Sequence, residues 1–150
     1  MQKITIRRLK PKDRERLYQF FMSLSRRTKR FFHPHKFDRK SAEKICRDKK
    51  DYYYGLFYGK EIIGYSMLRG FSEGYEVPSY GGCIADGCQG FGLGQFLLRW
   101  TIKQAKNMGC KRVILKVDIS NDKAIHIYRK FGFKLFAMAD KRTWKMDKEI

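Results

Sequence analysis

Apolar residues recur along the chain with two different spacings, which divide it into predicted strands and helices. Segments rich in β-branched and aromatic residues, or alternating apolar with polar residues, predict strands. Steps of three and four residues predict helices with one buried face. The predicted strands are residues 3–9, 52–58, 61–68, 79–86 and 112–118, with two short strands around Asp140. The predicted helices are one that begins near Pro11 and includes residues 17–24, and three more at 41–46, 93–108 and 122–131.

Turns and helix ends follow from single residues between these segments. Gly59 lies in a tight turn between two strands, and Gly109 and Gly132 end the two later helices. Asp38 is placed to cap the helix at 41–46. The basic and aromatic stretch 26–38 keeps neither spacing, so we interpret most of it as a loop.

The predicted element order is β-α-α-β-β-β-α-β-α-β-β. Antiparallel hairpins combined with a helical crossover predict an α/β fold, a three-layer α/β/α sandwich around a mixed, mostly antiparallel sheet. No repeat or Pro/Ser-rich linker divides the 150 residues, which is the size of one domain. We therefore predict that residues 1–150 form a single domain.

Charge and cysteine content narrow the classes of function. The chain has 34 Lys and Arg against 15 Asp and Glu, a formal charge of +19 that attracts anionic ligands or serves solubility. Apolar runs are far shorter than the ~20 residues of a membrane span, and no secretory signal is evident. The four cysteines form neither a C-x-x-C pair nor a cluster with histidine. We expect a reduced, cytoplasmic protein that has no metal and does not bind membranes.

A glycine-rich segment lies between a predicted strand and a predicted helix. Such a turn directs backbone N–H groups and the positive end of a helix dipole at one point, which suits phosphate. Gly94 is not followed by Lys-Ser/Thr, so the segment is not a P-loop, and the glycine spacing does not fit the dinucleotide fingerprint. The pattern Q-x-x-G-x-G does fit, with Gln89, Gly92 and Gly94.

A second motif begins at Asn121 and has the form N-x-x-A-x-x-x-Y-x-x-x-G-F. Its matching residues are Asn121, Ala124, Tyr128, Gly132 and Phe133. With these two motifs in this order, the chain resembles the GNAT superfamily of acetyl-CoA-dependent N-acetyltransferases. The resemblance implies a GNAT-like fold, acetyl-CoA (CoA) as co-substrate and direct attack of a primary amine on the thioester.

The resemblance also implies which residues contact the cofactor. The pantetheine arm would pair with the backbone of Cys83, Ile84 and Ala85 and lie beside Asn121 and Ala124. The pyrophosphate would bind the loop formed by Gln89, Gly90, Phe91, Gly92, Leu93, Gly94 and Gln95. Tyr128 would lie beside the sulfur, where a phenol, protonated at neutral pH, can donate its proton to the departing thiolate.

The acceptor side is less defined by sequence. Glu76 is a candidate general base, and His33, His35 and Glu73 are candidate acceptor contacts. Exposed surface glutamates are the commoner explanation for Glu73 and Glu76, and hydrogen-bonded loop histidines explain His33 and His35 at least as well. Residues 31–35 and 77–79 resemble acetyltransferases of amino-sugar and nucleotide-sugar metabolism. We therefore expect a small acceptor such as an amino sugar or a nucleotide-linked amino sugar.

Three alternatives stay open at this point: an enzyme that acetylates a protein or peptide amine, a non-catalytic acyl-CoA-binding protein, and a nucleic-acid-binding protein. The charge and the segment 26–37 favour the last, but no recognised nucleic-acid motif accompanies them. We expect nucleic acid to bind only non-specifically through charge, and a homodimer is compatible with the sequence.

Overall fold

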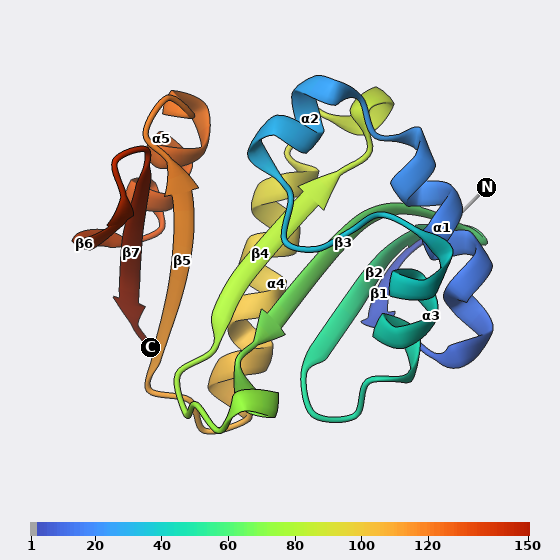
Figure 1. Ribbon diagram of the computed structural model, residues 1–150, viewed down its shortest axis with the longest axis horizontal. Helices are drawn as coiled ribbons and strands as arrows, with labels where there is room; N and C mark the ends of the chain where they lie inside the picture. Colours follow the sequence, from blue (N-terminus) through green and yellow to red (C-terminus); the bar gives the residue numbers. More distant parts are fainter. Residues whose placement is uncertain (1–2) are drawn as a thin grey trace.

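Seven strands form one mixed sheet in the computed structural model, which describes residues 3–150 (Figure 1). The strands are β1 (Ile4–Arg8), β2 (Tyr52–Tyr58), β3 (Glu61–Arg69), β4 (Ser79–Ile84), β5 (Arg112–Asp118), β6 (Lys134–Asp140) and β7 (Thr143–Glu149). Their order across the sheet is β1-β2-β3-β4-β5-β7-β6. Within the described residues only β4 and β5 pair in parallel. The prediction of an α/β fold with a mixed, mostly antiparallel sheet is confirmed.

Helices cover both faces of this sheet. They are α1 (Arg14–Ser23), α2 (Arg26–Phe31), α3 (Arg39–Arg47), α4 (Leu93–Asn107) and α5 (Asp122–Lys130). The apolar sides of α1 and α3 share one core cluster with Tyr65 and Met67 of β3. Those of α4 and α5 share a second cluster with Leu68 of β3 and with β5. Since alternate residues of a strand face opposite sides, the helices form layers on the two faces.

The segment 26–31, which the sequence pattern assigns to a loop, is the helix α2. The Ser25 hydroxyl caps it by accepting a hydrogen bond from the Thr28 N–H at 3.1 Å, and the Phe32 N–H bonds to the Thr28 carbonyl. The helix is six residues long and buries none of them, so it has no apolar period to detect. The prediction for α3 is confirmed, including its cap: the Ser41 N–H donates to Asp38 at 2.8 Å.

The parallel strands β4 and β5 pair only near their N-terminal ends. Ser79 lies opposite Ile114 and Tyr80 opposite Leu115, after which no pairing continues. Residues 81–84 of β4 and 116–118 of β5 therefore diverge, and we call these two segments the splay. In Figure 1 the strands separate toward the top of the view, where α2 and α5 lie. The backbone edge of β4 is thus open to a ligand.

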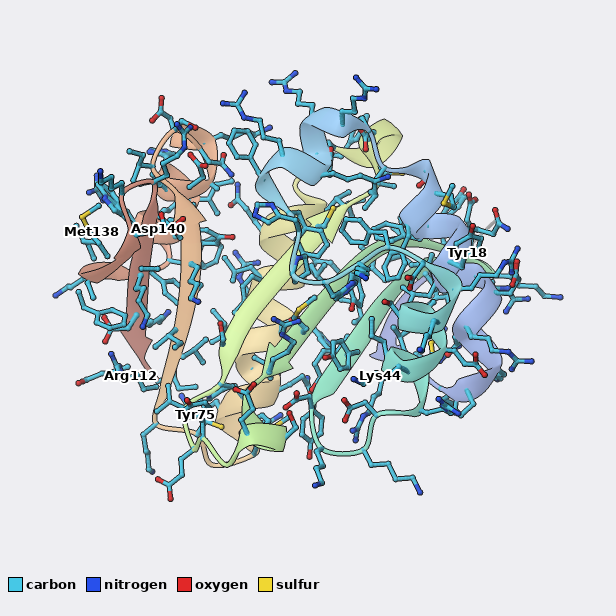
Figure 2. The ribbon with its side chains drawn as sticks, in the orientation of Figure 1. Tyr18, Lys44, Tyr75, Arg112, Met138 and Asp140 are labelled. Carbon is cyan, nitrogen blue, oxygen red and sulfur yellow. The ribbon has the colours of Figure 1, made fainter. Side chains whose placement is uncertain are left out.

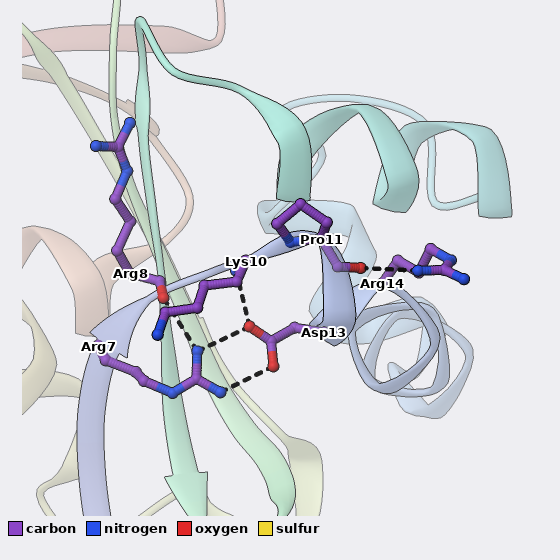
Figure 3. A network of polar contacts seen from close by, with 6 residues as sticks. All are labelled: Arg7, Arg8, Lys10, Pro11, Asp13 and Arg14. Atoms are coloured by element: carbon purple, nitrogen blue, oxygen red, sulfur yellow. Dashed lines mark hydrogen bonds and ion pairs between the residues drawn. The ribbon is translucent and has the colours of Figure 1, made fainter.

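A buried carboxylate fixes the turn between β1 and α1 (Figure 3). Asp13 has no exposed side-chain surface and accepts two hydrogen bonds from the Arg7 guanidinium, each at 2.8 Å, and one from the Lys10 N–H. Burial alone raises the pKa of Asp13, but these hydrogen bonds and the positive charges of Arg7 and Lys12 outweigh it. The pKa therefore stands below its ordinary value.

Asp13→Asn is expected to lower the free energy of unfolding by roughly 2–3 kcal/mol, because Arg7 and the Lys10 N–H lose a charged acceptor. The depressed pKa means that this stabilisation is complete above the unfolded-state pKa of ~3.9 and is lost as pH falls through the folded-state pKa. Urea unfolding across pH measures both effects. Glu15→Gln, which removes the exposed ion pair with Arg39, is the control and is expected to change stability far less. Equal losses in the two variants would contradict the assignment.

Candidate functional site

The backbone of β4 turns alternate residues toward the splay. The Ala85 N–H donates to the Ile63 carbonyl at 2.8 Å, so the neighbouring pair of Ile84 with Gly64 is the kind whose backbone groups point away from each other. The same alternation directs Gly82 toward the splay. Cys83 and Ala85 were expected to pair with pantetheine, but the backbone groups of Cys83 and the Ala85 N–H face β3, and the Ala85 carbonyl accepts from the Cys88 N–H at 2.9 Å. The open edge therefore consists of the Ile84 N–H and the backbone of Gly82, because the Ile84 carbonyl accepts from the Gln89 side chain, and Gly82 was missed from sequence.

The glycine-rich loop ends at an uncapped helix terminus. Gly90 and Gly92 have φ of 87° and 82°, a left-handed conformation that L-residues with a side chain rarely adopt. Gly92 is the N-cap of α4, and no side chain accepts from the first turn of this helix. The N–H groups at the start of α4 and the positive end of its dipole are therefore free to bind an anion. This arrangement fits a pyrophosphate.

The glycine-rich loop is held in place by hydrogen bonds of its own side chains and of residues at α2. The Gln89 amide donates to the Ile84 carbonyl at 2.9 Å and to the Thr28 hydroxyl at 3.3 Å. The Asp86 carboxylate accepts from the Ser25 N–H and the Thr28 hydroxyl, both at 3.2 Å. Burial raises the pKa of Asp86, yet these hydrogen bonds bring it below its ordinary value. Sequence reasoning missed Ser25 and Thr28 because it assigned most of the segment 26–38 to a loop. It missed Asp86 because the partners of this carboxylate are Ser25 and Thr28, which lie far from it along the chain.

The residues of the second motif build the start and end of α5. The Asn121 side-chain oxygen caps the helix by accepting from the Ala124 N–H at 3.3 Å. Tyr128 is partly buried on the sheet side, and its ring meets the fully buried Phe133 edge-on, with 5.9 Å between centroids. Burial raises the pKa of Tyr128 to about 12, so its hydroxyl keeps its proton throughout the neutral range.

A second phenol, not identified from sequence, lies at the base of the splay. Tyr80 is buried, and its ring lies over Gly82: a Cβ at Gly82 would come within 2.2 Å of the Tyr80 hydroxyl oxygen. Burial raises the pKa of Tyr80 well above its ordinary value, and the proximity of Tyr128 and Cys83 adds to this. Two protonated phenols are thus close to one another here. A glycine inside a strand was the available signal, since it often marks a close approach.

Cys83 is a poor candidate for a nucleophile. Burial, together with the negative charge of Asp86, raises the pKa of its thiol to about 12, so the reactive thiolate is scarce at neutral pH. This agrees with direct transfer of the acyl group rather than a cysteine intermediate. Within residues 3–150, no group of three or more His, Cys, Asp or Glu side chains is arranged to hold a metal ion.

The two histidines have different surroundings. His35 packs among Phe21, Phe37 and Tyr65. Its Nδ1 donates to the Lys36 carbonyl at 2.7 Å, which leaves Nε2 to accept from the Tyr65 hydroxyl at 2.9 Å. Burial lowers the pKa of His35, in keeping with this neutral form. Both ring nitrogens of His35 are therefore occupied by hydrogen bonds within the protein. His33, in contrast, is exposed, with its Nδ1 3.2 Å from the Lys29 carbonyl.

The two candidate glutamates lie before the paired end of β4. Glu73 belongs to the short 3-10 helix Phe71–Glu73, and Glu76 follows in the loop that leads to Ser79. Both side chains are exposed. Because the Ile114 N–H already bonds to the Pro78 carbonyl, this loop lies at the closed end of the β4–β5 pair, opposite the splay. The structure does not bring either glutamate together with Tyr128 or the glycine-rich loop.

Known proteins share both this sequence pattern and this fold. The family model described as "Acetyltransferase (GNAT) family" matches residues 17–133. A spermine/spermidine N(1)-acetyltransferase of Bacillus subtilis is 33% identical over 106 residues, which is 62% of this chain and 69% of that protein. A mycothiol acetyltransferase of Corynebacterium efficiens is 35% identical over 78 residues, and the match spans only 26% of its length and 52% of this chain.

Solved structures agree in fold at low sequence identity. The GNAT domain of S. lividans PAT superimposes with a TM-score of 0.86 at 16% identity, over 99% of this chain and 97% of that one. The PaiA N-acetyltransferase from Thermoplasma acidophilum, solved in complex with coenzyme A, superimposes with a TM-score of 0.80 at 20% identity, over 99% of both chains. None of the helices described in residues 3–150 has the length and apolar character needed to cross a bilayer. With a family match over most of its length and a relative of one-third identity, the chain belongs to the acetyltransferase (GNAT) family.

Proposed function

We propose that this chain transfers an acetyl group from acetyl-CoA to a primary amine by direct attack. The observation that carries the proposal is the meeting of three features at one place: the open backbone edge of β4, the uncapped N-terminus of α4 and the protonated phenol of Tyr128. The first two features suit the two halves of CoA, an amide-containing arm and a pyrophosphate. The third suits a leaving thiolate.

Each part of the chain has a distinct task in this proposal. The Ile84 N–H and the backbone groups of Gly82 align the pantetheine arm, and the N–H groups of residues 90–95 bind the pyrophosphate. Asn121 caps α5 with its oxygen and keeps its amide nitrogen for the arm. Acetyl-CoA supplies the activated thioester. Tyr128 holds a proton near the sulfur and releases it as the thiolate departs, a role for which the phenol must be protonated at neutral pH.

The acceptor class needs revision relative to the sequence-based expectation. The relatives are named for spermine, spermidine and mycothiol, so they do not support an amino-sugar acceptor. The proposal is therefore limited to a primary amine, and it does not use His35, Glu73 or Glu76. The acidic loop that contains Glu73 and Glu76 lies away from the splay, so we assign neither side chain as the base.

A turnover screen tests this function directly. The protein is incubated with acetyl-CoA and single amines drawn from amino acids, polyamines, amino alcohols and peptide N-termini, and free thiol is measured with a chromogenic reagent. We expect thiol release that rises and saturates with one class of amine, and a product that mass spectrometry identifies as the amine carrying a single added acetyl group. Thiol release at one slow rate with and without every amine, despite tight CoA binding by calorimetry, would favour a non-catalytic acyl-CoA-binding protein.

A further inference from the structure

A basic groove lies between α2 and the N-terminus of α5. It encloses about 630 Å³ and is lined by Arg26, Arg27 and Arg30 on one side and by Asn121, Asp122 and Lys123 on the other. Figure 1 shows that these helices lie at the end of the molecule where β4 and β5 separate. The groove therefore adjoins the mouth of the splay, where the acetyl group is to be transferred.

The basic side chains of the groove form no ion pair within 4 Å, although Asp118 lies close enough to Arg30 to feel its charge. Among residues 3–150, the ion pairs within 4 Å involve Arg7, Arg39 and Arg112, and none involves a residue of α2 or Lys123. The three arginines of the groove are exposed, and Figure 2 shows nitrogen-tipped side chains projecting from α2 at the edge of the molecule. Asp122 is the only carboxylate among the lining residues. Among the lining residues, four basic groups against one acidic group give the groove a net positive charge.

The short helix that presents these arginines is fixed in place. Ser25 caps it, and both Ser25 and Thr28 bond to Asp86 beside the glycine-rich loop. On the far side, the pKa of Asp118 at the end of β5 is lowered first by hydrogen bonds from Ser120 and then by the charges of Arg142 and Arg30. The helix is thus bonded to the β4 side at Asp86 and faces residues 120–123 of the β5 side across the groove. The arginines therefore stand on a helix with a fixed position.

We infer that this groove binds an acid group of the acceptor, so that the enzyme selects an amine that also carries a phosphate or a carboxylate. The inference rests on the proposed acetyl transfer and names its substrate class. Arginine is suited to such a group, since its planar guanidinium donates paired hydrogen bonds to phosphate and carboxylate oxygens. The class differs from the polyamines named for the relatives, because several positive charges beside three unpaired arginines would be repelled.

The groove is distinct from the loop that suits the CoA pyrophosphate. None of residues 89–95 lines it, and the N–H groups of that loop form an anion site of their own. An anion at α2 and α5 is therefore a second anion, on the side of the mouth away from the glycines. If the arginines instead bind a phosphate of CoA, removing them will weaken CoA binding, which the experiment measures.

The test compares two acceptors that differ by one phosphoryl group, O-phosphoethanolamine and ethanolamine. The double variant Arg27→Gln/Arg30→Gln removes two charges from the groove, and Lys44→Gln/Arg47→Gln removes two from exposed positions on α3, remote from the mouth (Figure 2 labels Lys44). We expect wild type and the α3 variant to use phosphoethanolamine with a kcat/KM at least about tenfold higher than ethanolamine. The α2 variant is expected to lose this preference while its Kd for CoA stays unchanged. No preference in wild type, or a better reaction with spermidine, would overturn the inference.

A binding measurement tests whether the groove binds an anion, independently of turnover. Calorimetry with inorganic pyrophosphate is carried out on protein saturated with CoA, so that the glycine-rich loop is occupied. We expect binding to wild type and to the α3 variant, and about tenfold weaker binding to the α2 variant. Equal affinities, or a loss of CoA affinity in the α2 variant, would overturn the inference. If pyrophosphate binding depends on Arg27 and Arg30 but no amine is acetylated, the proposed function fails while the anion site stands.

Discussion

Tyr128→Phe is expected to lower turnover by roughly 10²- to 10⁴-fold while the affinity for acetyl-CoA changes little, the range expected for loss of a general acid. Phenylalanine keeps the ring that packs against Phe133, so the variant removes the hydroxyl and leaves the core intact. Because burial raises the pKa of Tyr128 to about 12, wild type should show no loss of activity from ionisation of this phenol as pH rises to about 10. Steady-state kinetics across pH, together with calorimetry for CoA, measures these effects.

Two matched variants separate chemistry from packing. Tyr54→Phe removes another buried phenol from the same core cluster, on a strand remote from the splay, and should leave kcat unchanged. Tyr80→Phe tests the second phenol at the base of the splay. If Tyr80→Phe is the variant that loses turnover, the proton donor is Tyr80 and the role of Tyr128 must be withdrawn. A fall of only a few-fold in both would mean that water supplies the proton.

Gly92→Val is expected to lower the affinity for CoA by about 5- to 30-fold. A left-handed backbone costs a residue with a side chain ~1–2 kcal/mol, and the loop can avoid that cost only by turning its N–H groups away from the phosphate site. A Cβ at Gly92 would meet no heavy atom within 4 Å, so the requirement comes from the φ of 82° and not from crowding within the protein. Calorimetric titration with CoA measures the loss, and circular dichroism checks that helical content is retained.

Gly74→Val provides the control for backbone strain. Gly74 also has a positive φ, 88°, and open space around it, but it lies in the loop before β4, away from the splay. This variant should lose stability without losing affinity for CoA. Gly94 has no left-handed conformation, and a Cβ there would make an ordinary 3.8 Å contact with Ile84. The glycine-rich loop should therefore fold normally in a Gly94→Ala variant. Unchanged affinity for CoA in Gly92→Val would contradict the assignment of this loop to the CoA-binding site.

Local sequence was sufficient to predict those features that depend on the conformational preference of a single residue. Gly90 and Gly92 do adopt the left-handed conformation that a phosphate loop requires, and Asp38 does cap α3. The strands were found because their apolar period reflects burial in a sheet. Sequence failed for α2, whose stability comes from a cap and from bonds to Asp86, a residue remote from it along the chain.

Some features of the candidate site could likewise be predicted from sequence, and others could not. The sequence identified the glycine-rich loop and the motif from Asn121 to Phe133, and the resemblance of these two motifs to the GNAT superfamily predicted the family, because such motifs lie within short segments. Only the tertiary structure decided that β4 opens its edge at Gly82 and Ile84, that His35 belongs to the core and that Tyr80 reaches the splay. It also decided that the arginines of α2 face the start of α5. These features arise from pairing and packing between segments far apart in the chain, and no local period encodes which side chains such contacts bring together.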